Sequence, residues 1–126
     1  MFHLKLTLLL TPFLNGTNQR ANILPTLFSW FFDQQTEKAK EKIDHVLFVV
    51  THAERTPEKF LKHIEGRKGL YEIRVEMGNN IFRIFCCFDK GKIIVLFNGF
   101  QKKIQKLPKA EIDLAVKLMN EYFENK

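Results

Sequence analysis

Residues 70–100, LYEIRVEMGNNIFRIFCCFDKGKIIVLFNGF, decide the fold of this chain. Residues 70–76 alternate apolar and charged side chains, which is the period-two pattern of a half-buried β-strand. Residues 81–88 are almost wholly apolar, as in a strand covered on both faces, and residues 93–97 form a third apolar run. Short turns that contain glycine separate the three runs. The sequence therefore predicts a three-stranded antiparallel meander with the best-buried strand in the middle.

The two turns predict the register of these strands. If residues 78–79 form a two-residue hairpin loop, Arg74 lies opposite Arg83. If residues 90–91 form a second loop of the same length, Arg83 lies opposite Asn98. A change of one residue in either loop would turn the paired side chains to the other face.

We call the side of the predicted sheet that carries both arginines the arginine face. Like charges directly opposite each other destabilise a sheet, and an unpaired buried charge is costly. A sequence that places Arg74, Arg83 and Asn98 side by side therefore favours an anion bound there. The alternative is that Glu72 or Glu76 neutralises the arginines.

A basic segment follows the third strand. Lys102, Lys103 and Lys106 stand between that strand and Pro108, and the end of a strand holds side chains in fixed directions. Lys102 has an even spacing from Asn98 and shares the arginine face if the strand continues. These lysines either converge on a polyanion or form a solvated basic turn. The formal net charge of +6 favours a polyanionic partner, either nucleic acid or an acidic protein.

Composition indicates one compact domain. A chain of 126 residues is of typical domain size, and its 13 phenylalanines predict an aromatic core. Cys86 and Cys87 are adjacent in a strand and point to opposite faces, so we expect small core residues in a reducing compartment. The sequence has no CxxC pair, HExxH motif or glycine-rich phosphate loop, and we expect neither a metal nor a cofactor.

The N-terminal 20 residues are atypical. Apolar side chains alternate with His3, Lys5 and Thr7, which suits an edge or paired strand. The alternative is the core of a secretory signal, although a basic start and a small-residue cleavage site are missing. The apolar run is too short to span a membrane. We therefore expect residues 1–20 to form an extension or a first strand, and residues 21–126 to form a single domain.

Three helices are predicted around the meander. The first begins near Pro25, and the second has Thr36 as its N-cap. The third has Pro108 in its first turn. Core-facing stripes on the second and third helices comprise Ile43, Val46, Leu47 and Val50, and Ile112, Ala115, Val116, Met119 and Phe123, respectively. The expected fold class is α+β, with two N-terminal helices, an antiparallel sheet and a C-terminal helix.

Four segments in this order resemble the RelE/HigB-like toxins, and more narrowly the branch described as phage-derived toxin-like proteins. They are FLKHIEG at 60–66, GLYEIRV at 69–75, IFRIF at 81–85 and LFNGFQKK at 96–103. The resemblance covers about residues 26–125 and implies a compact RelE-like α+β toxin of a type II toxin–antitoxin pair.

Such toxins typically cleave mRNA, commonly on the ribosome, and an antitoxin encoded beside them silences them. RNA carries its own nucleophile, the 2′-hydroxyl, so the enzyme has to align it, move protons and stabilise the phosphorane. This chemistry requires no metal or cofactor. The implied partners are mRNA, the ribosome and a small helix-turn-helix antitoxin, with a toxin–antitoxin heterotetramer as one assembly. The implied location is the cytoplasm, with no membrane partner.

The resemblance assigns the scissile phosphate to Arg83, with Arg74 beside it, because a guanidinium donates bidentately and stays charged. The predicted RNA-binding residues are Asn98, Lys102, Lys103 and Lys106.

The acid–base group is left open among several candidates. His63 is one, although it is equally suited to capping a segment or lying at the surface. Tyr71 is another, but it faces the core if Arg74 faces the substrate. Glu72 lies on the arginine face and either acts as a base or pairs with an arginine.

Two other functions fit the same architecture. One is a toxin that binds a protein target such as gyrase and performs no RNA chemistry. The other is an inactive relative that still binds its antitoxin. The concentration of basic residues favours the nuclease.

Overall fold

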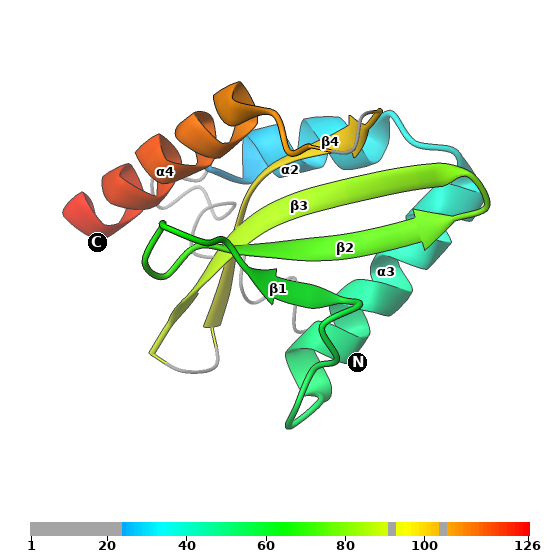
Figure 1. Ribbon diagram of the computed structural model, residues 1–126, viewed down its shortest axis with the longest axis horizontal. Coiled ribbons are helices and arrows are strands. Elements are labelled where there is room, and N and C mark those ends of the chain that lie inside the picture. Colours follow the sequence, from blue (N-terminus) through cyan, green and yellow to red (C-terminus); the bar gives the residue numbers. More distant parts are fainter. Residues whose placement is uncertain (1–23, 91–92, 104–105) are drawn as a thin grey trace, which may run out of the picture.

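The computed structural model describes residues 24–90, 93–103 and 106–126 (Figure 1). Within them the elements are α2 (Leu24–Asp33), α3 (Glu37–His52), β1 (Leu61–His63), β2 (Tyr71–Met77), β3 (Asn80–Asp89), β4 (Ile93–Lys102) and α4 (Lys109–Glu124). The strands form one antiparallel sheet in the order β1-β2-β3-β4. The predicted α+β class is confirmed, and the arrangement is compatible with a RelE-like fold. The expectation for residues 1–20 lies outside the described residues.

Helices α2 and α3 cover one side of the sheet, which we call the helix face. In Figure 1 both helices lie behind the strands, with α3 across β2 and α2 along β4. Thr36 is the N-cap of α3, as predicted, and its Oγ1 accepts a hydrogen bond from the Ala39 N–H at 3.1 Å. The predicted stripe of α3 is buried, and it packs on the alternate residues Ile73, Val75, Phe82, Ile84, Cys86, Ile94 and Leu96. The helix face is therefore an apolar interface.

Helix α4 covers only part of the opposite side. Its Ala115 and Leu118 pack in a second cluster with Phe85, Cys87 and Phe97. Cys86 and Cys87 are both free, and they lie in different clusters, so the prediction of opposite faces is confirmed.

The predicted stripe of α4 needs one correction. Phe123 is 45% exposed, and Leu118 is the buried residue that the prediction missed. At the end of this helix Tyr122 is the residue that turns inward, and its hydroxyl donates to Asp89 Oδ2 at 2.7 Å. The Lys126 ammonium lies 3.0 Å from the other oxygen of Asp89. It also lies 5.6 Å from the centroid of the Phe123 ring, which is at the surface. Within the described residues, no helix combines the length and apolarity needed to cross a membrane.

The register between β2 and β3 matches the prediction, because Arg74 pairs with Arg83 and Met77 with Asn80. The prediction for β3 and β4 was wrong, since Arg83 pairs with Phe100 and not with Asn98.

Two separate one-residue changes cause this difference. Asp89 pairs with Ile93, so three residues connect these strands and not two. Ile84 pairs with Gly99 but Cys86 pairs with Leu96, so β4 contains a bulge with one extra residue. Together the two changes shift the pairing of β4 against β3 by two residues. Because side chains alternate along a strand, a shift of two keeps Lys102 on the arginine face, opposite Ile81.

The short strand β1 was not predicted as a strand. Its three residues pair with β2, and Lys62 lies opposite Glu72. The pairing is extended by the Arg74 N–H, which donates to the Phe60 carbonyl oxygen at 2.8 Å. Strand β1 therefore adds Lys62 to the arginine face.

Candidate nucleic-acid interface

A charged trio forms the centre of the arginine face. Arg74 and Arg83 lie opposite each other on β2 and β3, and Glu72 is two residues before Arg74 on the same side of β2. Glu72 Oε1 is 3.1 Å from Arg83 Nε, and Glu72 Oε2 is 4.0 Å from Arg74 Nε. The carboxylate therefore reaches both guanidinium groups. In Figure 1 no helix stands in front of β2 and β3 along the half of these strands nearest their connecting turn.

Glu72 is thus the acid that neutralises the arginines, whereas Glu76 is exposed. Arg83 is only 2% exposed and Glu72 only 5%. Burial lowers the pKa of Arg83, and the negative charge of Glu72 opposes that shift. The sequence analysis had named Glu72 or Glu76 as an alternative counter-charge for the arginines, and the structure has Glu72 beside them.

The trio is incompletely hydrogen-bonded among the described residues. Arg83 Nη1 donates to the Phe82 carbonyl oxygen at 3.1 Å, and Arg74 Nη1 donates to the Glu58 carbonyl oxygen at 3.5 Å. In contrast, the Arg83 Nε–H is not aligned with Glu72, and no hydrogen bond reaches Arg74 Nε. Buried polar groups are normally paired. The protein around the trio therefore leaves these buried donors without a well-formed hydrogen bond.

The sheet arranges the neighbours of the trio in rows. One row across the strands is Arg74, Arg83 and Phe100. The next row is Glu76, Ile81 and Lys102.

Phe100 was not predicted in this row, because the predicted register placed Asn98 in its position. The Phe100 ring is half-buried, and its centroid is 5.7 Å from that of Phe85. An aromatic ring beside phosphate-binding groups can stack on a nucleic-acid base.

A hollow of about 390 Å³ opens next to Glu72, between β1 and the beginning of α4. It is lined by Lys62, His63, Ile64, Glu65, Glu72, Leu107 and Ile112. Because Glu72 borders this space, its carboxylate is the member of the trio that a ligand in the hollow would meet.

Asn98 is held away from the trio. The bulge places it opposite Phe85, and its Nδ2 donates to the carbonyl oxygen and Oε1 of Glu111 at 3.1 and 2.9 Å. Asn98 therefore links β4 to the first turn of α4.

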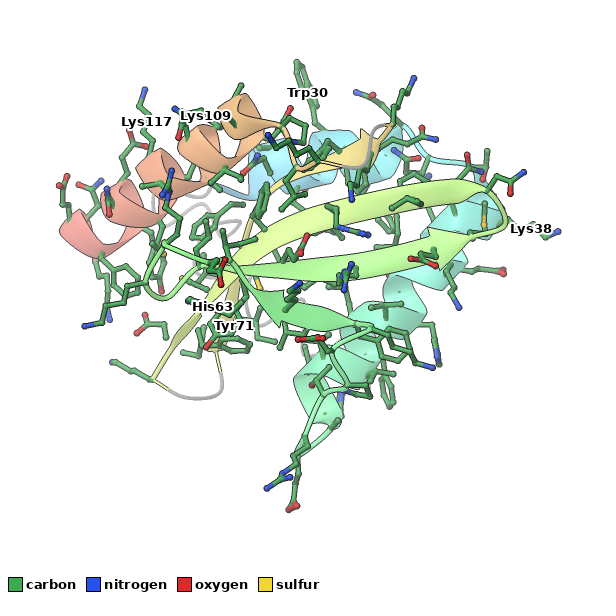
Figure 2. All side chains as sticks on the ribbon, viewed as in Figure 1. Trp30, Lys38, His63, Tyr71, Lys109 and Lys117 are labelled. Carbon is green, nitrogen blue, oxygen red and sulfur yellow. The ribbon has the colours of Figure 1, made fainter. Side chains whose placement is uncertain are left out.

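His63 alternates with Lys62 along β1 and lies opposite Tyr71, although it also borders the hollow beside Glu72. Its ring meets the Tyr71 ring edge-on with centroids 5.1 Å apart (Figure 2). Tyr71 packs against the core of the helix face, as expected. The structure thus brings Glu72, and not His63, beside Arg74 and Arg83.

The lysines of the basic segment differ in position. Lys102 is partly buried at the end of β4, in line with the arginine face. Lys103 and Lys106 are exposed beyond it. The described residues contain no group of three His, Cys, Asp or Glu side chains that could hold a metal ion.

These side chains define what the arginine face can do. Its guanidinium groups can bind a phosphate, the carboxylate of Glu72 can accept a proton, and Phe100 can stack on a base.

Comparison with known proteins supplies a family. The family described as Phage derived protein Gp49-like (DUF891) matches residues 30–120, which include the whole sheet and most of α4. No curated protein and no solved structure matches the chain. The matched segment makes up well over half of the sequence, and the chain therefore belongs to the Gp49-like family of phage-derived proteins.

Proposed function

We propose that this chain is the toxin of a toxin–antitoxin pair and acts as an endoribonuclease on ribosome-bound mRNA, without a metal or cofactor. The observation that carries the proposal is the trio of Arg74, Glu72 and Arg83, in which one carboxylate lies within reach of two guanidinium groups. Membership in a toxin-like, RelE-related family supports it.

The partly exposed Arg74 is the first phosphate-binding group. Its side chain is 27% exposed, whereas that of Arg83 is 3% exposed, so RNA meets Arg74 first. Phosphate oxygens then compete with Glu72 for the arginine donors. Arg83 joins the phosphate when Glu72 is displaced from it.

Glu72 is the proposed general base. Released from the arginines, its carboxylate accepts the proton of the 2′-hydroxyl while the 2′-oxygen forms a bond to phosphorus. The bond from phosphorus to the 5′-oxygen breaks, which leaves a cyclic phosphate and a 5′-hydroxyl. The arginines stabilise the charge of the phosphorane, and Lys102 in the adjacent row stabilises the leaving 5′-oxygen, which takes its proton from water.

Binding of the flanking RNA is assigned to the neighbouring groups. Lys103 and Lys106 contact further phosphates, and Phe100 stacks on a base. The proposed partners are mRNA on the ribosome and a helix-turn-helix antitoxin, in a heterotetramer in the cytoplasm.

The burial of Arg83 favours one other candidate. A guanidinium that is 2% exposed and already paired with Glu72 also fits an inactive relative, in which the trio is structural. This protein would bind its antitoxin and cleave nothing.

The test is induction in bacteria with mapping of mRNA 5′ ends. The informative variant is Arg74→Ala, because its partial exposure lets the fold tolerate the change. Arg83→Ala is examined beside it, with its folded fraction measured by circular dichroism. Arg55→Ala is the matched control, since Arg55 is exposed in the segment after α3 and is not a member of the trio.

The proposal is supported if the wild type and Arg55→Ala both produce new codon-phased cuts in mRNA. Arg74→Ala should reduce this cutting at least about 100-fold. Unchanged cutting by a folded Arg74→Ala variant would show that the assigned mechanism is wrong. Growth arrest with intact mRNA would indicate a protein-binding toxin, and the absence of both effects would indicate the inactive relative.

A further inference from the structure

The largest exposed aromatic side chain of the described residues lies outside the arginine face. Trp30, the single tryptophan of the chain, is 66% exposed on α2. Figure 2 shows it standing away from the body of the molecule. Leu114 on α4 is 36% exposed. The proposed RNA chemistry uses neither residue.

These two side chains border a hollow of about 460 Å³ between α2, β4 and α4. Leu27, Phe31 and Phe100 supply further apolar lining, and Gln34, Gln35 and Gln101 supply amides. Asn98 also borders this space, and its buried Oδ1 has no hydrogen-bond partner among the described residues. The hollow thus combines apolar surface with an unused acceptor, as in sites that receive a partner's side chains.

The charge around the hollow selects the kind of partner. Lys103 lines it, and Lys117 is exposed one helical turn after Leu114. The carboxylate of Glu111, which also lines the hollow, is engaged by Asn98. A second copy of this chain, with a net charge of +6, would bring like charges together. An acidic partner is complementary.

A protein segment suits the hollow better than RNA does. The lining is mostly apolar and amide, with Lys103 as its cation, so it offers little to a phosphate backbone. Trp and Leu beside a concave surface match the apolar side of an amphipathic helix, which inserts side chains at i, i+3, i+4 and i+7.

We propose that the hollow between α2 and α4 is the docking groove for an acidic amphipathic helix of the antitoxin, with Trp30 and Leu114 as its anchors. This inference rests on the proposed function only in naming the partner as an antitoxin. Phe100 and Lys103 border both the hollow and the arginine face, whereas Trp30 and the trio lie on different elements. Substitutions of Trp30 and of Arg74 should therefore affect antitoxin binding and RNA cleavage separately.

The test uses Trp30 as an intrinsic probe. The purified full chain is titrated with the purified product of the reading frame that adjoins its gene, and tryptophan emission and acrylamide quenching are recorded. Trp30→Phe serves as the blank for any tryptophan of the added protein. Affinities of Trp30→Glu and of Phe123→Glu are measured by calorimetry. Phe123 is the matched control, because it is a 45% exposed aromatic residue at the far end of α4.

The expected result is a blue shift of Trp30 emission and protection from acrylamide on binding. Trp30→Glu should weaken binding at least about 30-fold, as for an aromatic anchor, and Phe123→Glu less than about threefold. Arg74→Ala should bind with unchanged affinity. Each variant is checked for wild-type circular dichroism.

Several outcomes would overturn the inference. The first two are failure of the added protein to bind and binding that leaves Trp30 emission unchanged. The others are a homodimer, seen in sedimentation, that Trp30→Glu abolishes, and protection of Trp30 by RNA. mRNA cleavage without the added protein is measured separately for wild type and Trp30→Glu. If neither the wild type nor Trp30→Glu cleaves mRNA, the proposed nuclease function is contradicted. The docking inference is then judged by the Trp30 fluorescence alone.

Discussion

The two faces of the sheet are made by alternate residues of the same strands, yet they differ in chemistry. The helix face, under α2 and α3, is an apolar cluster. All four buried polar or charged residues of the described chain belong instead to the opposite side, which carries the arginine face and α4. They are Glu72, Arg83, Asp89 and Asn98.

This difference separates stability from function. Apolar burial on the helix face contributes stability in proportion to area. A buried ion pair such as Glu72 and Arg83 contributes little net stability, because desolvation offsets the attraction between the charges. The sequence nevertheless places them there, which is consistent with the proposed phosphate-binding site. The following predictions test the contrast, from the largest expected effect to the smallest.

The largest effect is expected from Glu72→Ala, which leaves Arg83 buried without its counter-charge. We expect the free energy of unfolding to fall by about 3–5 kcal/mol in urea denaturation. The control Glu76→Ala, at the exposed end of the same strand, should change it by less than about 0.5 kcal/mol.

A double substitution sharpens this test. Glu72→Leu combined with Arg83→Met removes both charges and should recover most of the lost stability. If Glu72→Ala alone cost less than about 1 kcal/mol, the trio would not be the buried charge system described above.

A smaller effect is expected on the helix face from Gly99→Ala. A Cβ atom at Gly99 would lie 2.6–2.9 Å from three carbons of the Phe31 ring. That ring is buried, with its centroid 5.9 Å from that of Phe82, so it has little room to move. We expect a loss of about 1–3 kcal/mol. Introducing the change into a Phe31→Leu background should cost much less, and equal costs in the two backgrounds would exclude this contact as the cause.

The smallest effect is expected from Tyr122→Phe at the end of α4. The Tyr122 hydroxyl and then Lys126 hold the pKa of Asp89 below its usual value. A carboxylate with a lowered folded-state pKa adds stability above its unfolded pKa of about 4, and this stability is lost as pH falls through the folded pKa. We expect a cost of about 1 kcal/mol at pH 7 that shrinks toward pH 2.

Urea titrations of wild type and variant over that pH range provide the measurement. Tyr71→Phe is the control, because the Tyr71 ring packs against His63 and Phe88 on the helix face. A pH-independent cost for Tyr122→Phe would argue against its link to Asp89.

Local sequence determined most of the fold. The cap at Thr36, the stripe of α3 and the alternation of β2 each follow from short-range rules, and the structure has them where predicted. The pairing of Arg74 with Arg83 also followed from sequence, because a two-residue turn fixes the register of both strands beside it.

Tertiary structure decided what lies around the arginines. The bulge in β4, which puts Phe100 beside Arg83 and ties Asn98 to Glu111, was not predicted, although Gly99 inside an apolar strand is a local signal for one. The choice of Glu72 as counter-ion, and the position of His63 opposite Tyr71, depend on how β1, β2 and β3 meet. Sequence alone thus determined which residue types lie on each strand, because side-chain alternation is local. Beyond the β2–β3 hairpin, only tertiary structure decided their neighbours, because pairing across strands depends on loop lengths and bulges that the whole packed sheet selects.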